Sequence, residues 1–322
     1  MSRLVLEVSD VRAEALDVLL IELRRAGGSE LEPFTPGAHL EIELPNGMIR
    51  HYSLTNDWRE RERYVVGVGR AAMGRGGSDF IHQSLRRGGR ITSSEPRNNF
   101  ALDLDAASHL FVAGGIGVTP IMSMIRRCEA EGRDWHLIYA ARNAQRAAFY
   151  ETLRAFGDKV HFHFDDQAGA VLDARRWLVE RPDGQHVYCC GPQPLMQSVR
   201  ERAAHHPAGS VHFEYFVAPA AEALVEGVDA GARAGEFRVE LRRSKLSLVV
   251  PASLSILEVL EANGVNVPYS CREGLCRTCE TTVCEGEVEH RDYVLSAEER
   301  AEGKTMMVCV SRATSPVLVL DR

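Results

Sequence analysis

The chain has 322 residues, which at about 100–200 residues per domain is enough for two or three domains with cores of their own. Its net charge of −7 argues against general nucleic-acid binding, which needs a basic surface. No apolar run approaches the roughly 18 residues of a membrane span, and the N-terminus lacks the pattern of a secretory signal. These features predict a cytoplasmic protein that binds neither nucleic acid nor a membrane.

The first hundred residues are rich in short alternating segments. These are Leu4–Val8, Leu19–Leu23, His39–Leu44 and Tyr64–Val68. Turn-type stretches such as Thr35-Pro36-Gly37 separate them. Short strands at this spacing predict a barrel or a sandwich over residues 1–103.

From Ser108 the pattern changes, and apolar runs of strand length alternate with helical ones. The predicted strands are Leu110–Ala113, His136–Ala140, Val160–Phe164 and His186–Cys189, and the predicted helices are Ile121–Glu131, Ala147–Phe156 and Pro194–Ala204. This alternation predicts an α/β domain over residues 104–222, with a parallel sheet covered by helices.

A stretch rich in Ala, Gly and Glu follows, and it predicts a linker over residues 223–235. Beyond it, strands are predicted at Phe237–Leu241 and Leu246–Val250, and a short helix at Ser255–Ala262. These elements open a third predicted domain, residues 236–322.

Most of the cysteines gather in this last domain. Cys271, Cys276 and Cys279 follow the spacing C-x4-C-x2-C, and Cys309 comes after 29 intervening residues. This is the plant-type spacing for a [2Fe–2S] cluster, in which a tight loop aims thiolates and backbone N–H groups at one small group. Zinc is the alternative, but zinc motifs usually pair C-x2-C with a second short pair.

Two neighbours of these cysteines also carry a prediction. Gly274 relieves the loop sterically, because it has no Cβ. Cys284 is left over from the motif, and its surroundings Thr281-Thr282-Val283 predict a buried cysteine on a strand.

A glycine-rich turn lies between the first strand and the first helix of the α/β domain. It contains Gly114, Gly115 and Gly117, which let the backbone approach a pyrophosphate at the N-terminus of the helix. Pro120 stands where the usual third glycine would be, so the turn alone is a weak signal. A second motif, Cys190-Gly191-Pro192, ends the last predicted strand of the domain. Together the two motifs resemble the pyridine-nucleotide domain of the ferredoxin-NADP reductase superfamily, and this resemblance implies a nicotinamide site.

The choice between NADH and NADPH depends on charges after two strands. Arg142 and Arg146 follow one strand, and Asp165 and Asp166 follow the next. A 2′-phosphate favours arginine or lysine, whereas a free ribose hydroxyl pairs with a carboxylate. We predict NADH, mainly from the family resemblance given below, with Arg142 and Asp166 as contacts; the arginines as solvated charges are the alternative.

The β-rich domain carries a candidate flavin site. The stretch Arg50-His51-Tyr52-Ser53 resembles the R-x-Y-S motif of flavin domains in the same superfamily. In this interpretation Arg50 supplies a cation for a phosphate and Ser53 a hydrogen bond to the flavin ring. Further along the chain, Gly76, Gly77 and Ser78 precede the predicted helix Asp79–Leu85, whose first N–H groups would bind the same phosphate. Arg70 is the predicted second cation. A flexible loop is the alternative to this phosphate site.

Taken together, these motifs carry a family resemblance. The stretch Val267-Pro268-Tyr269-Ser270-Cys271 resembles a plant-type ferredoxin loop, and the flavin and Cys-Gly-Pro motifs resemble the ferredoxin-NADP reductase superfamily. The order of domains resembles the phthalate dioxygenase reductase and vanillate O-demethylase reductase family. The resemblance implies an antiparallel β-barrel flavin domain, an α/β nucleotide domain and an α+β (β-grasp) ferredoxin domain.

The resemblance also implies the cofactors and the residues nearest the reaction. The cofactors are FMN, NADH and a [2Fe–2S] cluster, whereas relatives with an N-terminal ferredoxin generally use FAD. Cys190 would lie beside the nicotinamide, with Ser53 and Thr119 close to the flavin. Phe216, or alternatively Tyr215, would cover the flavin ring, and core packing is the other interpretation of this aromatic pair.

The implied function is that of an NADH-dependent oxidoreductase that passes electrons singly through FMN and the cluster to a terminal oxygenase of the Rieske non-haem iron type. Such an oxygenase would hydroxylate or O-demethylate an aromatic compound. One alternative is a cytochrome-type oxygenase or another electron acceptor. The other is a non-enzymatic redox sensor, against which the intact cofactor motifs argue.

Overall fold

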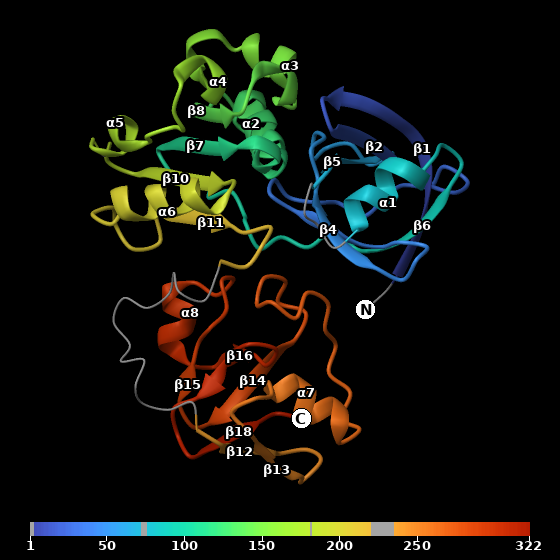
Figure 1. The fold of residues 1–322 in the computed structure, drawn as a ribbon, viewed down its shortest axis with the longest axis vertical. Helices are drawn as coiled ribbons and strands as arrows, with labels where there is room; N and C mark the ends of the chain where they lie inside the picture. Colours follow the sequence, from blue (N-terminus) through green and yellow to red (C-terminus); the bar gives the residue numbers. More distant parts are fainter. Residues whose placement is uncertain (1–2, 72–75, 181, 220–234) are drawn as a thin grey trace. The chain divides into compact units, whose positions relative to one another are not determined.

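The computed structural model describes residues 3–71, 76–180, 182–219 and 235–322. The chain divides into two compact units, Met1–Glu214 and Tyr215–Arg322 (Figure 1). The first unit contains both the predicted flavin region and the predicted nucleotide region. The predicted boundary between these regions, at residues 103 and 104, stays a prediction, and residues 223–234 of the predicted linker lie outside the described residues.

The first part of unit 1 is an antiparallel barrel. Its strands are β1 (Arg3–Ala15), β2 (Val18–Arg25), β3 (His39–Glu43), β4 (Ile49–Ser53), β5 (Tyr64–Gly69) and β6 (Arg90–Ser94). They lie in the order β4-β3-β6-β1-β2-β5, and a bridge between Leu54 and Val66 joins the two outer strands. The alternating segments predicted as strands are confirmed, and the Arg50–Ser53 motif forms most of β4.

The barrel core follows from the period of two in its strands. Along β1, Leu4, Leu6 and Val8 are buried, while the residues between them are more exposed. Helix α1 (Gly77–Ser84) adds Ile81 to the same core. Because this contact fixes the helix on the barrel, its N-terminus has a defined place next to β4.

The second part of unit 1 is a parallel sheet. Its strands are β7 (Ser108–Gly114), β8 (Asp134–Ala141), β9 (Val160–Phe164), β10 (Gln185–Cys190) and β11 (Val211–Glu214), in the order β11-β10-β7-β8-β9. The strands end at one edge, and this edge therefore gathers the loops that the motifs occupy. The predicted α/β architecture is confirmed (Figure 1).

Helices cover both faces of this sheet. The helical segments are η1 (Gly115–Gly117), α2 (Val118–Glu131), η2 (Ala144–Arg146), α3 (Tyr150–Arg154), η3 (Gly157–Lys159), α4 (Asp165–Ala168), α5 (Arg175–Leu178) and α6 (Gln193–Arg202). Cys190 faces the core that α2 shares, and Cys189 faces α6 through Met196. The prediction of Cys189 as a buried strand residue is confirmed.

One predicted helix, Ala147–Phe156, was too long. Only Tyr150–Arg154 is α-helical, because Phe149 takes a left-handed conformation with φ of 60° just before the helix. Ala147 and Ala148 are apolar because they are buried in the core, and not because they form a helical face. Residues buried by tertiary contacts therefore gave an apolar pattern like that of a helix.

Unit 2 is a mixed sheet with one parallel pair at its centre, β12 with β18. Its strands are β12 (Phe237–Leu241), β13 (Ser247–Val250), β14 (Glu280–Glu285), β15 (Val288–Glu289), β16 (Thr305–Met307), β17 (Arg312–Ala313) and β18 (Val317–Leu320), and its helices are α7 (Ile256–Ala262) and α8 (Ala297–Glu302). The main sheet has the order β13-β12-β18-β14-β16. Helix α7 buries Ile256, Leu257 and Leu260 in the core of this unit.

A reciprocal hydrogen-bonded cap starts α7. The Ser255 hydroxyl accepts a hydrogen bond from Glu258 N, and the Glu258 carboxylate accepts one from Ser255 N. The helix predicted at Ser255–Ala262 is thereby confirmed. Among the described residues, no helix combines the length and the apolar character that crossing a bilayer would require.

Candidate cofactor sites

The four predicted cluster ligands meet in unit 2. Cys276, Cys279 and Cys309 are buried, and Cys271 is half-buried. Cys271 Sγ accepts hydrogen bonds from the backbone N–H groups of Glu273 at 3.3 Å and Leu275 at 3.4 Å. Hydrogen bonds from Cys276 and Cys309, together with these two N–H groups, lower the pKa of Cys271. The loop therefore stabilises the thiolate, which is the form that binds iron.

The backbone of the cluster loop needs unusual conformations. Arg272, Gly274 and Arg277 have φ of 58°, 71° and 59°. A Cβ on Gly274 would lie 2.8 Å from Val310 Cγ2 and 3.0 Å from Asp292 Cα, so only glycine fits. Within the described ranges, no three metal-binding side chains are arranged around a single metal ion. A two-iron cluster takes its four thiolates over two metal ions, and the four cysteines fit this group.

Cys284 corrects one expectation. It lies on β14, as predicted, but it is half-exposed and not buried. The register of β14 against β18 shifts between Val283 and Glu285, and this irregularity turns Cys284 away from the regular alternation.

Arg50 and the start of helix α1 come together at the candidate flavin phosphate site. A Cβ on Gly77 would lie 2.4 Å from Arg50 Nε, so the guanidinium packs directly on the first helical residue. Gly76 precedes the helix with φ of 79°, and no side chain caps the helix N-terminus. Uncapped N–H groups beside an arginine fit an anion such as a phosphate.

Two other predicted residues at this helix already form hydrogen bonds with neighbouring residues. Arg70 Nε donates to Asp79 Oδ1 at 2.7 Å, and Ser78 Oγ accepts from Ala71 N at 3.1 Å. Asp79 thus neutralises part of the charge that Arg70 would offer to a phosphate. Arg50 is the stronger candidate, because it packs directly on Gly77 at the helix start.

The side chains of the motif on strand β4 alternate between the two faces of the sheet. Arg50 and Tyr52 share one face, and His51 and Ser53 share the other. Burial raises the pKa of Tyr52 to about 12, so its hydroxyl stays protonated. The ring of His51 lies beside that of His39, with the centroids 5.3 Å apart and the ring planes tilted by 47°.

A residue that the sequence did not single out lies near Ser53. This is Glu214, whose Oε2 atom is buried and, like Ser53 Oγ, has no hydrogen-bond partner among the described residues. Burial raises the pKa of Glu214 to about 8, and the nearby Ser53 hydroxyl lowers it only in part. Both orphaned atoms are available to a polar ligand. A carboxyl within an otherwise aromatic stretch, Phe213–Phe216, was the available signal, and Glu214 is the last residue of β11.

Cys190 is the neighbour of Glu214 in the sheet. The two residues pair across β10 and β11. Burial and the adjacent Glu214 carboxyl raise the pKa of Cys190 well above its ordinary value. Cys190 is therefore a neutral thiol at physiological pH, suited to packing against a ring and not to attack.

The glycines of the two nucleotide motifs hold the loops against each other. A Cβ on Gly117 would lie 2.2 Å from Cys190 O, and one on Gly114 would lie 2.4 Å from Pro192 Cδ. A Cβ on Gly191 would lie 2.9 Å from Gly114 Cα. Gly115 differs, because it has φ of 53° and open space beside it. The structure brings both motifs together, whereas their contact with a pyrophosphate stays a prediction.

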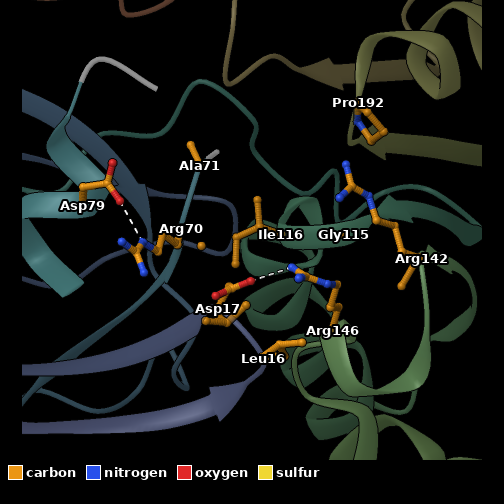
Figure 2. A pocket seen from close by; sticks show the side chains of 13 residues that line it. Leu16, Asp17, Arg70, Ala71, Asp79, Gly115, Ile116, Arg142, Arg146 and Pro192 are labelled. Carbon is orange, nitrogen blue, oxygen red and sulfur yellow. Dashed lines mark hydrogen bonds and ion pairs between the residues drawn. The ribbon is translucent and has the colours of Figure 1, made fainter. Parts of the chain in front are cut away.

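A cleft of about 850 Å³ separates the barrel from the parallel sheet. It is lined by Leu16, Asp17, Val18, Gly69, Arg70, Ala71 and Asp79 of the barrel region, and by Gly115, Ile116, Ala141, Arg142, Arg146 and Pro192 of the sheet region. Figure 2 shows the ion pairs Arg70–Asp79 and Asp17–Arg146 at this cleft, with Arg142 and Pro192 on the side away from Asp79. Its size and lining suit a nucleotide.

The predicted NADH contacts lie at the ends of neighbouring strands. Arg142 follows β8 and is exposed, and Asp166 N donates to Arg142 O at 3.1 Å. Arg146 is less available, because its guanidinium binds Asp17 at 2.7 Å.

The structure supports the predicted position of Thr119 and leaves that of Phe216 a prediction. Thr119 is buried at the start of α2, and its Cγ2 would be 2.6 Å from a Cβ on Gly67 of β5. It therefore reaches the barrel, as predicted for a residue close to the flavin. Phe216 belongs to unit 2 and is 43% exposed, and its place over a flavin stays a prediction.

Comparison with known proteins places these sites in a family. Residues 239–314 match the 2Fe-2S iron-sulfur cluster binding domain family, and residues 89–210 match the N-terminal domain of dimethylamine monooxygenase subunit DmmA-like proteins. The chain is 43% identical over 322 residues to phthalate dioxygenase reductase of Burkholderia cepacia, covering 98% of this chain and 96% of that protein. The chain belongs to the phthalate dioxygenase reductase family.

Solved structures agree with this membership. A phthalate dioxygenase reductase structure matches with a TM-score of 0.70 and 42% identity, over 100% of this chain and 98% of that one. An intact type IV self-sufficient cytochrome P450 monooxygenase matches with a TM-score of 0.91 and 36% identity. The match covers 99% of this chain but only 41% of that protein.

Membership of the phthalate dioxygenase reductase family confirms the predicted class and fold. The chain is an oxidoreductase with a flavin- and nucleotide-binding region of the ferredoxin-reductase type and a ferredoxin domain. The predicted cofactors FMN, NADH and [2Fe–2S] are those of this family. The individual site residues stay predictions.

Proposed function

We propose that this chain takes electrons from NADH at the barrel–sheet cleft, passes them through FMN to a [2Fe–2S] cluster, and delivers them in the cytoplasm to a terminal oxygenase of the Rieske non-haem iron type. The observation that carries the proposal is the cysteine constellation of unit 2 combined with the cleft of unit 1. A relative with near-complete coverage is named as the reductase of a dioxygenase, which supports the choice of partner.

At the flavin site, Arg50 and the first turn of α1 would hold the phosphate. Gly76 and Gly77 bring no bulky side chain to the start of the helix, and Arg50 adds a positive charge beside it. Ser78 and Arg70 would complete the site. When bound, FMN converts the two-electron oxidation of NADH into the single-electron steps that a [2Fe–2S] cluster accepts.

Around the reacting rings, the chain offers neutral and buried groups. Cys190 is a protonated thiol, and Glu214 is protonated at neutral pH because burial raises its pKa to about 8. Together with Ser53 and Thr119, they would exclude water and orient the rings by hydrogen bonds and packing. Glu214 Oε2 and Ser53 Oγ, for which the described residues provide no hydrogen-bond partner of normal geometry, are the atoms that would hold or accept a proton there.

At the nucleotide site, Gly115, Gly191 and Pro192 would line the pyrophosphate and nicotinamide. Arg142 would supply a cation, and Asp166 would pair with the ribose hydroxyl. A 2′-phosphate would be repelled by Asp166, and Arg146 is held by Asp17. These charges support NADH over NADPH.

A cytochrome-type acceptor is the second candidate. The specific observation in its favour is the TM-score of 0.91 to a self-sufficient cytochrome P450 monooxygenase, which exceeds the 0.70 to phthalate dioxygenase reductase. The full-length relatedness to a dioxygenase reductase favours the Rieske partner.

The first experiment is an anaerobic absorbance titration of the purified chain with NADH. We expect flavin and iron–sulfur bands together, and both should bleach. Cys276→Ser should lose the cluster but keep flavin bleaching, and Cys284→Ser should keep both. Protein without iron, sulfide and flavin would contradict the proposal.

The second experiment separates the two candidate partners. Reduced protein is mixed with a Rieske oxygenase or with a cytochrome P450 haem domain, and reoxidation is followed by stopped-flow absorbance. Faster reoxidation by the Rieske protein supports the proposed partner, and faster reoxidation by the haem domain supports the alternative.

A further inference from the structure

Helix α8 contacts the cluster loop at two charged points. Arg277, which follows the ligand Cys276, donates from Nη2 to Glu299 Oε1 at 2.5 Å. The other Glu299 oxygen, Oε2, accepts from Ser296 N at 2.8 Å and so caps the helix. Arg300, the next residue, binds Asp292 through both the backbone carbonyl and the carboxylate.

Asp292 is the most deeply buried charged residue of this arrangement. The residue is 2% exposed, and its side chain is fully covered. Asp292 Oδ1 accepts from Val294 N at 3.1 Å and from Leu295 N at 2.8 Å, and lies 3.6 Å from Arg300 Nη2. A buried carboxylate with this many fixed donors holds its segment of backbone rigidly.

This segment supports the middle of the cluster loop. Tyr293 N donates to Gly274 O at 3.0 Å, and a Cβ on Gly274 would lie 3.0 Å from Asp292 Cα. Gly274 stands between the ligands Cys271 and Cys276. Any shift of Asp292 therefore moves the backbone whose N–H groups reach Cys271 Sγ.

The Asp292 carboxylate can accept more hydrogen bonds than its neighbours donate. Asp292 Oδ2 is buried without a hydrogen bond of normal geometry among the described residues, and His290 Nδ1 stands 3.5 Å from it. In a low-dielectric interior, a carboxylate beside a redox centre disfavours the added electron.

We propose that Asp292 is a positioning residue for the cluster loop, that Arg300 of helix α8 anchors it, and that its negative charge lowers the reduction potential of the cluster. This inference rests on the proposed function, since it requires that the four cysteines hold a [2Fe–2S] cluster. Its two parts, position and charge, are separable because asparagine keeps the shape and the acceptor of aspartate but removes the charge.

The test uses the full chain purified anaerobically, with Asp292→Asn, Asp292→Ala and Arg300→Gln. Asp321→Asn is the matched control, because Asp321 is also ion-paired in unit 2, with Arg243, but is not part of this support. Iron and sulfide content report the position of the ligands, and the reduced fraction in equilibrium with a redox dye reports the potential.

We expect Asp292→Asn to keep its iron and sulfide and to raise the reduced-to-oxidised ratio at a fixed potential about threefold, or about 28 mV at 59 mV per tenfold. Arg300→Gln should shift this ratio in the opposite direction, because the carboxylate then lacks its cation. Asp292→Ala should lose at least half of its iron and sulfide. A purely structural role would not give opposite shifts for the two variants.

Two results would overturn the inference. The charge part fails if Asp292→Asn and Arg300→Gln both match the control in potential. The positioning part fails if Asp292→Ala holds the full cluster. If Asp292→Ala does not fold, the opposite shifts in potential of the other two variants still test the charge part. A lower iron and sulfide content in Arg300→Gln then tests the positioning part. A wild-type chain without iron and sulfide would overturn the proposed function itself.

Discussion

Asp17, at the tip of the β1–β2 hairpin, accepts a hydrogen bond from Arg146 Nη1 at 2.7 Å, and this ion pair joins the barrel to the loop after β8 across 129 residues of sequence. Two further hydrogen bonds support the same contact, Leu16 N to Gln145 O at 2.7 Å and Phe149 N to Glu14 Oε1 at 2.9 Å. The hairpin thus fixes one wall of the cleft relative to the other (Figure 2).

Removing this ion pair should have a small effect. Both side chains are 36% exposed, so solvent screens the interaction, and we expect a coupling of about 0.5–1 kcal/mol. The measurement is a double-mutant cycle of Asp17→Asn and Arg146→Gln on the free energy of unfolding. A coupling near zero would show that the two backbone contacts hold the hairpin alone.

Gly117 is the clearest steric test of the nucleotide loops. Its φ is ordinary, but a Cβ would lie 2.2 Å from the backbone oxygen of Cys190, which cannot rotate away. We expect Gly117→Ala to lower the free energy of unfolding by about 1–3 kcal/mol and to weaken NADH binding. Gly235→Ala is the control, because nothing lies within 4 Å of its Cβ position. Equal stability of both variants would contradict the packing.

Glu214 should make stability depend on pH. Its pKa is about 8 in the fold and 4.5 as the ordinary value, so the folded state holds the proton more tightly. The stabilisation is complete below about pH 4.5 and is lost as pH rises toward 8, with a slope of at most about 1.4 kcal/mol per pH unit.

Denaturant unfolding of wild type and Glu214→Gln at several pH values between 5 and 8.5 checks this dependence. The glutamine variant, which resembles the protonated acid, should gain stability relative to wild type as pH rises. Glu180→Gln, an exposed position, should show no such trend. A constant difference between wild type and Glu214→Gln would mean that Glu214 does not titrate in this range.

Arg50 should dominate binding of the flavin phosphate. Charge-assisted hydrogen bonds contribute about 1.5–3 kcal/mol, so Arg50→Gln should weaken FMN binding roughly tenfold to a hundredfold. Fluorescence titration of the flavin-free protein with FMN gives the Kd, and Arg90→Gln is the control, because Arg90 is an exposed residue at the start of β6. Riboflavin, which lacks the phosphate, should bind both variants alike; a larger loss for riboflavin would place Arg50 at the ring.

Local spacing made much of this protein predictable. The cysteine motif, the strand Val160–Phe164 and the capped helix after Ser255 depend on residues close in sequence, so their patterns were readable without the fold. The helix predicted from Ala147 failed because Ala147 and Ala148 are apolar for burial in a distant core, and Phe149 interrupts the helix with positive φ.

The sequence by itself determined which chemical groups are present and how the cluster ligands are spaced. Only the tertiary structure decided that Asp17 holds Arg146, that Asp79 holds Arg70, and that Glu214 stays protonated beside Ser53. The physical reason is that charge pairing and desolvation depend on distances between residues far apart in the chain, and folding sets these distances where sequence spacing does not.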